Sequence, residues 1–242
     1  DPWMTAVIIA AACFLCGLAL FFVNDVKSNV RGESLVSSFR NVLLDIWTIL
    51  KSQSGLLVVI LCFLPMGTGA ASNLWAAVAD DWNACADTVA LVTGVLGGLI
   101  MAAGCLIGGW ICDRMNRKTA YWIFGLVGAF TASGMAFAPK TELMYIIWTS
   151  LYAIAVGLSY AGFTAVVLEA MGTGAAATKY NIFAALSNTP IYYMIYINGQ
   201  AYTKWGPGGM LNTEAVFAFG AVLFFILLQV IFNRRKSSLV TN

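Results

Sequence analysis

The residues with the clearest chemical potential lie in a short polar stretch between two apolar runs. Its two arginines and its lysine can pair with carboxylates, and its aspartate can accept hydrogen bonds or face a helix N-terminus. A glycine near its start would let a neighbouring helix pack against the end of a span. Together these groups could form a latch, and they are Gly109, Asp113, Arg114, Asn116, Arg117 and Lys118.

Asn116 and Glu169 are the two further residues that we expect to shape this loop and to pair with it. A tight turn at Asn116 would need a left-handed backbone, which asparagine adopts more readily than other residues except glycine. Glu169 ends a later apolar run and is expected on the same side of the membrane as the loop. We therefore predict that Glu169 pairs with Arg117 or Arg114 rather than carrying protons. The alternative for the loop is a basic segment that only sets membrane orientation.

The other acidic residues do not indicate a proton pathway. Asp80, Asp81 and Asp87 are expected in an outer loop, where they can be solvated charges. No acidic residue is expected at mid-membrane. Because intramembrane carboxylates are rare and commonly functional, a proton-carrying carboxylate would then belong to helices outside this chain.

Most enzyme and cofactor chemistry is excluded. The chain has no histidine, which removes histidine bases, histidine-ligated haem and histidine-containing zinc sites. Cys13 and Cys16 have redox or metal spacing, but small-residue packing is the simpler interpretation on an apolar run. No nucleophile and base pair or phosphate-binding loop is visible. We expect no enzyme, no cofactor, no metal and no nucleic-acid partner.

Membrane spans must position these residues. Hydrophobic residues make up 60% and charged residues 10% of the 242 residues, and the mean hydropathy is +0.83. This leaves too little polar surface to cover a water-soluble globule. The predicted fold class is an all-α polytopic membrane protein with seven transmembrane helices. The predicted spans are 4–23, 55–79, 88–112, 120–138, 143–168, 179–198 and 215–232.

The segments between the spans are mostly short. An amphipathic helix lying flat on the membrane is predicted over 35–50, and 199–213 is predicted as an outer loop. The predicted organisation is a first transmembrane helix in 1–23, a linker in 24–54, a six-helix bundle in 55–233 and a tail in 234–242.

Helix breakers and glycine pairs mark particular spans. Residues 65–69 interrupt the second span with proline and glycine, and 188–190 interrupt the sixth. Lipid does not tolerate an opened backbone unless it faces protein or a water-filled cavity, so the first break is predicted to point inward. Two glycine pairs predict close helix packing on the third span. They are Gly94 with Gly98 and Gly104 with Gly108.

Basic residues orient the spans. If the N-terminus is outside and the C-terminus cytoplasmic, eleven of the thirteen basic residues are cytoplasmic and only Lys140 and Lys204 are outside. The positive-inside rule favours this orientation. A receptor or signalling scaffold without transport has the same plan and stays open as an alternative. A retinal pump is disfavoured because 215–232 contains no lysine for a Schiff base.

The pattern Gly109-x-x-x-Asp113-Arg114-x-Asn116-Arg117-Lys118 resembles a loop signature of the major facilitator superfamily, although that family usually has glycine at the position of Asn116. The resemblance implies an alternating-access transporter made of two six-helix halves, in which this loop is a gate. It makes 4–23 helix six and the bundle the C-terminal half. About five helices of the same parent protein would then precede the chain and act as its partner.

Three further stretches, 67–75, 169–175 and 180–190, are similar to the branch containing muropeptide permeases and acetyl-CoA transporters. This likeness implies secondary active uptake driven by protons, acting on a small amphiphilic solute such as a cell-wall muropeptide. It also implies a bacterial inner membrane. The implied partners are the lipid bilayer, the small-molecule substrate and the coupling proton.

Solute contacts are expected from polar and aromatic residues near the bilayer midplane, on broken helices and their neighbours. For each residue, interhelical packing or interfacial anchoring is the alternative. The candidates are Asn73, Trp75, Tyr152, Ser159, Tyr160, Asn188, Tyr192 and Tyr193.

Overall fold

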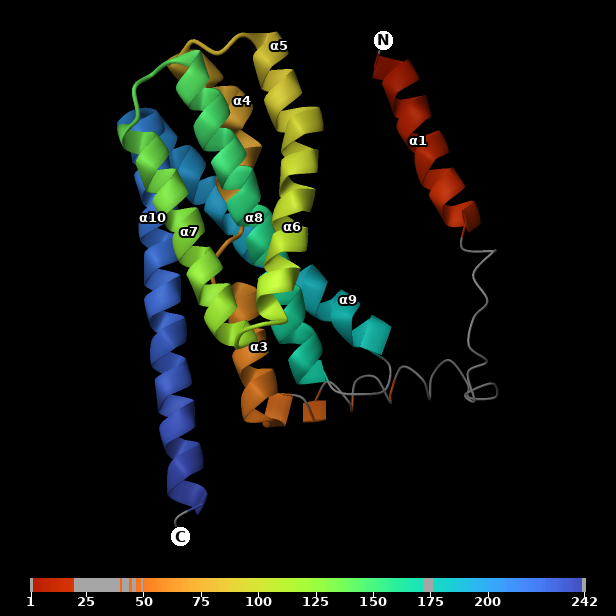
Figure 1. The fold of residues 1–242 in the computed structure, drawn as a ribbon, viewed down its shortest axis with the longest axis vertical. Coiled ribbons are helices and arrows are strands. Elements are labelled where there is room, and N and C mark those ends of the chain that lie inside the picture. Colours follow the sequence, from red (N-terminus) through yellow and green to blue (C-terminus); the bar gives the residue numbers. More distant parts are fainter. Residues whose placement is uncertain are drawn as a thin grey trace. The chain divides into compact units, whose positions relative to one another are not determined.

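The computed structural model describes residues 2–19, 40, 44, 47–48, 50–171 and 176–240. Within these ranges every regular element is helical (Figure 1). The chain divides into two compact units, Asp1–Asn41 and Val42–Asn242. The predicted all-α class is therefore confirmed.

The first unit contains helix α1, Pro2–Ala19. Its apolar side chains lie on the surface, with Ile8 64% and Phe14 68% exposed, as suits a helix surrounded by lipid or by other helices. It corresponds to the predicted first span, whose residues 20–23 lie outside the described residues. The predicted amphipathic helix over 35–50 also lies largely outside them.

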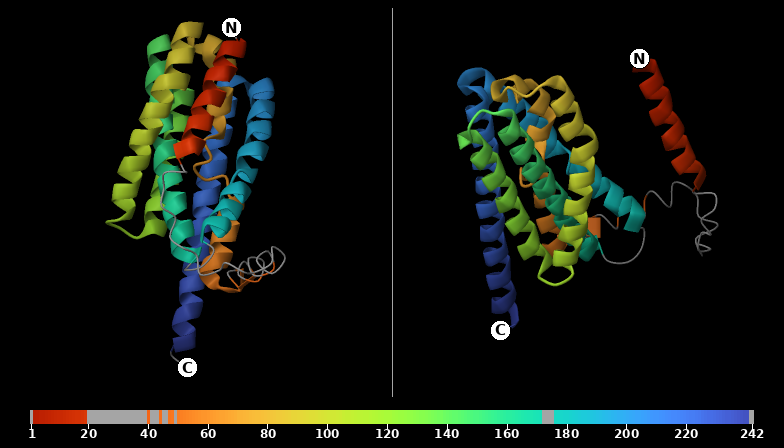
Figure 2. Two further views of the ribbon diagram at one scale, coloured as in Figure 1. Left: turned by 90° about the vertical axis from the view of Figure 1, so that its right-hand side faces the viewer. Right: turned by 45° about the horizontal axis from the view of Figure 1, so that its top comes forward.

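The second unit is a helical bundle with α8 running through it. Helix α8 packs against α6 and α7, and α7 packs against α10 (Figure 2). The long helices are α6 (Gly97–Cys112), α7 (Arg117–Phe137), α8 (Glu142–Met171) and α10 (Thr189–Val240). The short helices are α3 (Gln53–Phe63), α4 (Trp75–Val78), α5 (Ala86–Val89) and α9 (Ala176–Leu186). The remaining turns are the 3-10 helices η2 (Ala70–Leu74) and η3 (Ala79–Trp82) and the π-helix η4 (Ala90–Leu96).

Four stretches of the described chain are long and apolar enough to cross a bilayer. They are Ala86–Cys112, Arg117–Phe137, Glu142–Met171 and Lys179–Phe232. The first three correspond to the third, fourth and fifth predicted spans, and the last contains both the sixth and the seventh. The second predicted span is divided by its helix break, so its longest helix is α3 with 11 residues.

Glycines bring α6 and α8 into backbone contact. A Cβ atom on Gly104 would stand 2.6 Å from the Ile154 carbonyl oxygen, and one on Gly108 would stand 2.9 Å from the Ala161 Cβ. This confirms the predicted role of the Gly104 and Gly108 pair. The Gly94 and Gly98 pair does not make such a contact, because no described atom lies within 4 Å of either Cβ position.

The predicted break after α3 is present and faces protein. The chain leaves the helix at Leu64, and Gly67 and Gly69 take φ angles of 65° and 68°, which glycine adopts without a steric penalty. Tyrosines satisfy the opened carbonyls: the Tyr121 hydroxyl donates to the Met66 oxygen at 3.2 Å and the Tyr193 hydroxyl to the Phe63 oxygen at 2.8 Å. The prediction of an inward break is therefore confirmed.

The predicted outer loop over 199–213 is mostly helical, and the connection between the two helices is confined to a turn at Gly206. Helix α10 continues through this region and departs from helical geometry at Gly206, with φ 69° and ψ −169°, just before Pro207. Glycine permits this backbone and proline lacks the N–H that a continuous helix would need. The helix bends there into two limbs (Figure 2). Of the residues assigned to the loop, Met210 and Leu211 are buried, whereas Trp205 is 69% exposed.

The start of α10 agrees with the prediction, and its end does not. Helix α9 ends at Leu186 and α10 begins at Thr189, with Pro190 in its first turn, which confirms the predicted interruption of the sixth span. Helix α10 then continues to Val240. The segment predicted as a tail from 234 therefore begins as a helical extension of the last span.

Candidate functional site

The basic loop, defined as residues 109–118, joins α6 to α7 and is shaped by hydrogen bonds. The Asp113 N–H donates to the Gly109 oxygen at 3.0 Å. The Asn116 side-chain oxygen accepts from the backbone N–H groups of Lys118 and Thr119, at 3.1 and 3.2 Å. Asn116 is thus the N-cap of α7. Its φ of −59° and ψ of 121° are not left-handed, so that prediction is wrong.

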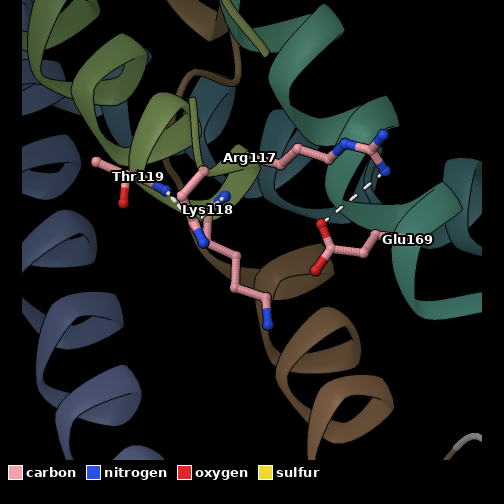
Figure 3. Close-up of polar contacts among 5 residues, drawn as sticks. Arg117, Lys118, Thr119 and Glu169 are labelled. Carbon is pink, nitrogen blue, oxygen red and sulfur yellow. Dashed lines mark hydrogen bonds and ion pairs between the residues drawn. The ribbon is translucent and has the colours of Figure 1, made fainter. Parts of the chain in front are cut away.

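Arg117 and Glu169 form an ion pair across α7 and α8 (Figure 3), with 3.9 Å between Nη1 and Oε2. The predicted pairing of Glu169 with Arg117 is therefore present. Both side chains are partly exposed, at 41% and 45%. Water screens such a pair, whose contribution to stability is about 0–1 kcal/mol, so the pair can break and reform at little cost.

Arg114 and Gly109 behave differently from expectation. The Arg114 guanidinium lies 3.9 Å from the Trp110 ring centroid and donates to the Trp110 carbonyl oxygen at 3.3 Å. Arg114 therefore stacks on its own helix, while Glu169 is paired with Arg117. No described atom lies within 4 Å of a Cβ position on Gly109, so the prediction that a neighbouring helix packs there is wrong among the described residues.

Gly109 instead borders an open groove of about 670 Å³ between α6 and α8. The groove also contains Asp113 and Arg117 from the basic loop, and Tyr160 from α8. Three residues predicted as gating groups and one predicted as a solute contact therefore share one surface. The Lys118 backbone belongs to the α7 cap.

Three of the predicted solute contacts come together at the helix breaks. Ser159, Tyr160 and Asn188 line a cavity of about 40 Å³ that is also bordered by Gly67 and Thr68. Ser159 is 2% exposed, and its buried hydroxyl has no hydrogen-bond partner among the described residues. A buried hydroxyl without a partner is costly, and it is available to a bound molecule.

The other predicted solute contacts do not join this cavity. Trp75 and Tyr152 pack edge to face inside the bundle, 5.3 Å between ring centroids. Asn73 donates to the Ala70 oxygen of its own turn at 3.4 Å. Tyr192 is 72% exposed, and the Tyr193 hydroxyl is bonded to the Phe63 oxygen. Tyr152 and Tyr193 are structural donors in this conformation.

A buried carboxylate was missed by the sequence reasoning. Glu214, in the second limb of α10, is 6% exposed. It accepts from the Tyr152 hydroxyl at 2.8 Å, the Asn198 amide at 2.6 Å and the Thr68 hydroxyl at 3.5 Å. Glu214 lies within the candidate span Lys179–Phe232, so this stretch contains a buried acidic residue that the sequence analysis did not identify.

At the opposite end of the bundle from the basic loop, two acidic residues have structural partners. Glu142 accepts from the Thr88 hydroxyl at 2.5 Å and from the Cys85 N–H at 3.3 Å. Asp81 accepts from the Tyr202 hydroxyl at 3.0 Å. Asp81 is therefore more than the solvated charge that was predicted.

Comparison with known families decides the class of protein. The profile of the Major Facilitator Superfamily matches residues 2–191, which covers the basic loop, both helix breaks and the small cavity. The chain belongs to the major facilitator superfamily. A comparison with curated proteins gives no match.

Membership of the major facilitator superfamily makes this chain part of an integral membrane protein and a membrane transporter. It favours transport over the receptor or scaffold alternative. In facilitator folds, binding sites lie near the bilayer midplane between the two halves, and discontinuous helices present backbone groups there. The breaks at 64–69 and 187–188 have this character, and the Ser159 cavity lies between them.

Proposed function

We propose that this facilitator chain belongs to a secondary transporter that takes up a small amphiphilic solute, such as a muropeptide, together with protons. The transporter would lie in a bacterial inner membrane with its C-terminus in the cytoplasm, as the placement of the basic residues favours. The solute would cross between this bundle and N-terminal helices of the same protein by alternating access.

The observation that carries the proposal is the cavity at the two helix breaks. Gly67 and Thr68 border it from the break after α3, and Asn188 borders it from the break before α10. Broken helices present backbone dipoles and side chains that can bind a solute and can change conformation with it. The cavity holds about 40 Å³, so it is one corner of a site that a larger solute would extend beyond.

The residues around this corner suit an amphiphilic solute. Tyr160 is 50% exposed and offers an aromatic face beside the buried Ser159 hydroxyl. Asn188, Tyr192 and Tyr196 recur every four residues at the start of α10, and the two tyrosines are 72% and 69% exposed. Residues four apart share one helix face. Aromatic faces next to amide and hydroxyl groups match sugar rings and peptide bonds.

The basic loop would act as the gate. The Arg117 and Glu169 pair holds the start of α7 to the end of α8, which fixes the loop while Asp113 and Arg114 stay exposed. Exposed charges can then pair with the N-terminal helices in one conformation and be released in the other. Because each such pair is weak, the gate can open without a large barrier.

Uptake by the full-length protein tests this proposal. Vesicles containing the protein are supplied with a labelled disaccharide-peptide, with and without an inward proton gradient. The proposal predicts gradient-driven accumulation, and a rise in the solute concentration for half-maximal uptake in Asn188→Ala. The exposed Asp87→Asn variant serves as a control. Accumulation that is equal with and without the gradient contradicts proton coupling, and no uptake of the disaccharide-peptide contradicts the solute class.

A further inference from the structure

Glu214 lies in a polar cluster that joins four parts of the bundle, defined here as Thr68, Tyr152, Asn198 and Glu214. Thr68 belongs to the break after α3, Tyr152 to α8, and Asn198 and Glu214 to the two limbs of α10. Asn198 and Glu214 are sixteen residues apart and meet because α10 bends at Gly206. Tyr152 and Asn198 are 3% and 0% exposed.

The donors that face the Glu214 carboxylate are neutral. Among the described residues they are two side-chain hydroxyl groups, one side-chain amide and the backbone N–H of Ala71. Helix α7 contributes only small residues here: Gly125, Gly128 and Ala129. Tyr152 is the one other titratable residue among those that line the adjoining cavity. A buried carboxylate without a cationic partner is expensive to keep charged, so this site favours binding a cation or a proton.

The small volume of the cavity beside Glu214 favours a proton over a larger cation. The cavity that contains Glu214 and Tyr152 measures about 10 Å³, which is near the lower limit for one water molecule. A sodium ion would need several oxygen ligands arranged around it, whereas a proton needs no added volume.

Asn198 can hydrogen bond to Glu214 in either protonation state of the carboxyl group. Its amide nitrogen donates to Glu214 at 2.6 Å, while its side-chain oxygen is buried and has no partner among the described residues. Rotation of the amide about its last bond exchanges donor for acceptor without moving the backbone. The same two side chains can therefore hydrogen bond when Glu214 is a carboxylate and when it is a carboxylic acid.

We propose that Glu214 is the proton-binding site of this transporter and that Asn198 switches its amide as the proton binds. A hydronium ion gives its proton to Oε2 and leaves as water, and the new O–H donates to the Asn198 oxygen. No other bond breaks. This assignment rests on the proposed proton-coupled uptake, and it places the proton-binding residue inside this chain.

Thr68 connects the proton site to the solute cavity. Its hydroxyl makes the longest contact to Glu214, 3.5 Å, and Thr68 also borders the cavity that contains Ser159. Neutralising the carboxylate weakens its attraction for donors, so the Thr68 contact is the first to be lost. The break after α3 is then free to rearrange around the solute.

Infrared difference spectroscopy of the full-length protein in lipid tests the site without any solute. The wild type should show the carbonyl band of a protonated carboxyl group that changes with pH. This band should be lost in Glu214→Gln and kept in Glu142→Gln, because the Glu142 carboxylate lies outside the polar cluster and accepts from Thr88 and Cys85. In Tyr152→Phe the band should persist to higher pH, because the charged form loses a donor. A titrating band that survives in Glu214→Gln overturns the assignment.

Transport measurements distinguish a failure of the Glu214 assignment from a failure of the proposed function. Glu214→Gln should lose at least tenfold in gradient-driven accumulation of the labelled disaccharide-peptide, yet keep solute exchange across vesicles that have no gradient. Accumulation by Glu214→Gln at the wild-type level overturns the assignment, as does wild-type accumulation that needs a sodium gradient instead. If the wild type moves no solute but its infrared band is lost in Glu214→Gln, the proton site stands and the proposed solute fails.

Discussion

Arg117 in the first turn of α7 reaches Glu169 near the end of α8, with 3.9 Å between Nη1 and Oε2. Reversing either charge places like charges together, and reversing both restores the attraction. The free energies of unfolding of the wild type, the two single variants and the double variant give the coupling energy between the two side chains. It should be about 0.2–1 kcal/mol. Uptake should fall in Arg117→Glu and in Glu169→Arg and should recover in the double variant.

The rescue should be specific for this pair. Arg114 stacks on Trp110, so combining Arg114→Glu with Glu169→Arg should not restore uptake. Raising the salt concentration should reduce the coupling energy, because the pair is partly exposed. Full recovery with the Arg114 combination would show that only the net charge of this surface matters.

Asn116 should act through its cap and not through a left-handed backbone. Its side-chain oxygen accepts two N–H groups at the start of α7. Asn116→Ala should therefore lower the free energy of unfolding by about 1 kcal/mol, whereas Asn116→Ser should lose much less because serine is also a good cap. Thermal unfolding of the purified protein compares the two. Equal losses in both variants would contradict the capping role of the Asn116 side chain.

The contact between α6 and α8 should not tolerate a methyl group. A Cβ on Gly104 would stand 2.6 Å from a backbone oxygen of α8, so Gly104→Ala should destabilise the bundle by about 1–3 kcal/mol. Gly98→Ala is the matched control, because no described atom lies near its Cβ position, and it should be neutral or slightly stabilising. Thermal unfolding of both variants gives the comparison. Similar melting of both would contradict the close contact.

Local chemistry was enough to predict the broken helices and the ion pair. Proline and glycine at 65–69 cannot continue a helix in lipid unless protein satisfies the backbone, and Tyr121 and Tyr193 do so. A glutamate and an arginine expected at the same membrane face were predicted to pair, and Arg117 and Glu169 do. These features depend on residue type and on span order, both of which are visible in the chain.

The bend in α10 could not be found in this way. The segment 199–213 contains glycine, lysine and a Gly-Pro step, which favour a loop when they are considered locally. The residues on both sides of Gly206 are helical because packing overrides that preference: Met210 and Leu211 are fully buried, and Tyr202 bonds to Asp81 and to the Ala77 oxygen. The predicted loop ends at 213 and the predicted seventh span begins at 215, so Glu214 belongs to neither, and its contact with Asn198 could not be predicted.

The most direct test of proton-coupled transport records proton entry and solute entry together. Vesicles containing the full-length wild-type protein and an internal pH indicator are given the disaccharide-peptide from outside, with no gradient imposed. Proton-coupled uptake predicts acidification of the vesicle interior that requires the solute and saturates with its concentration. Solute entry without acidification would contradict the proposed coupling.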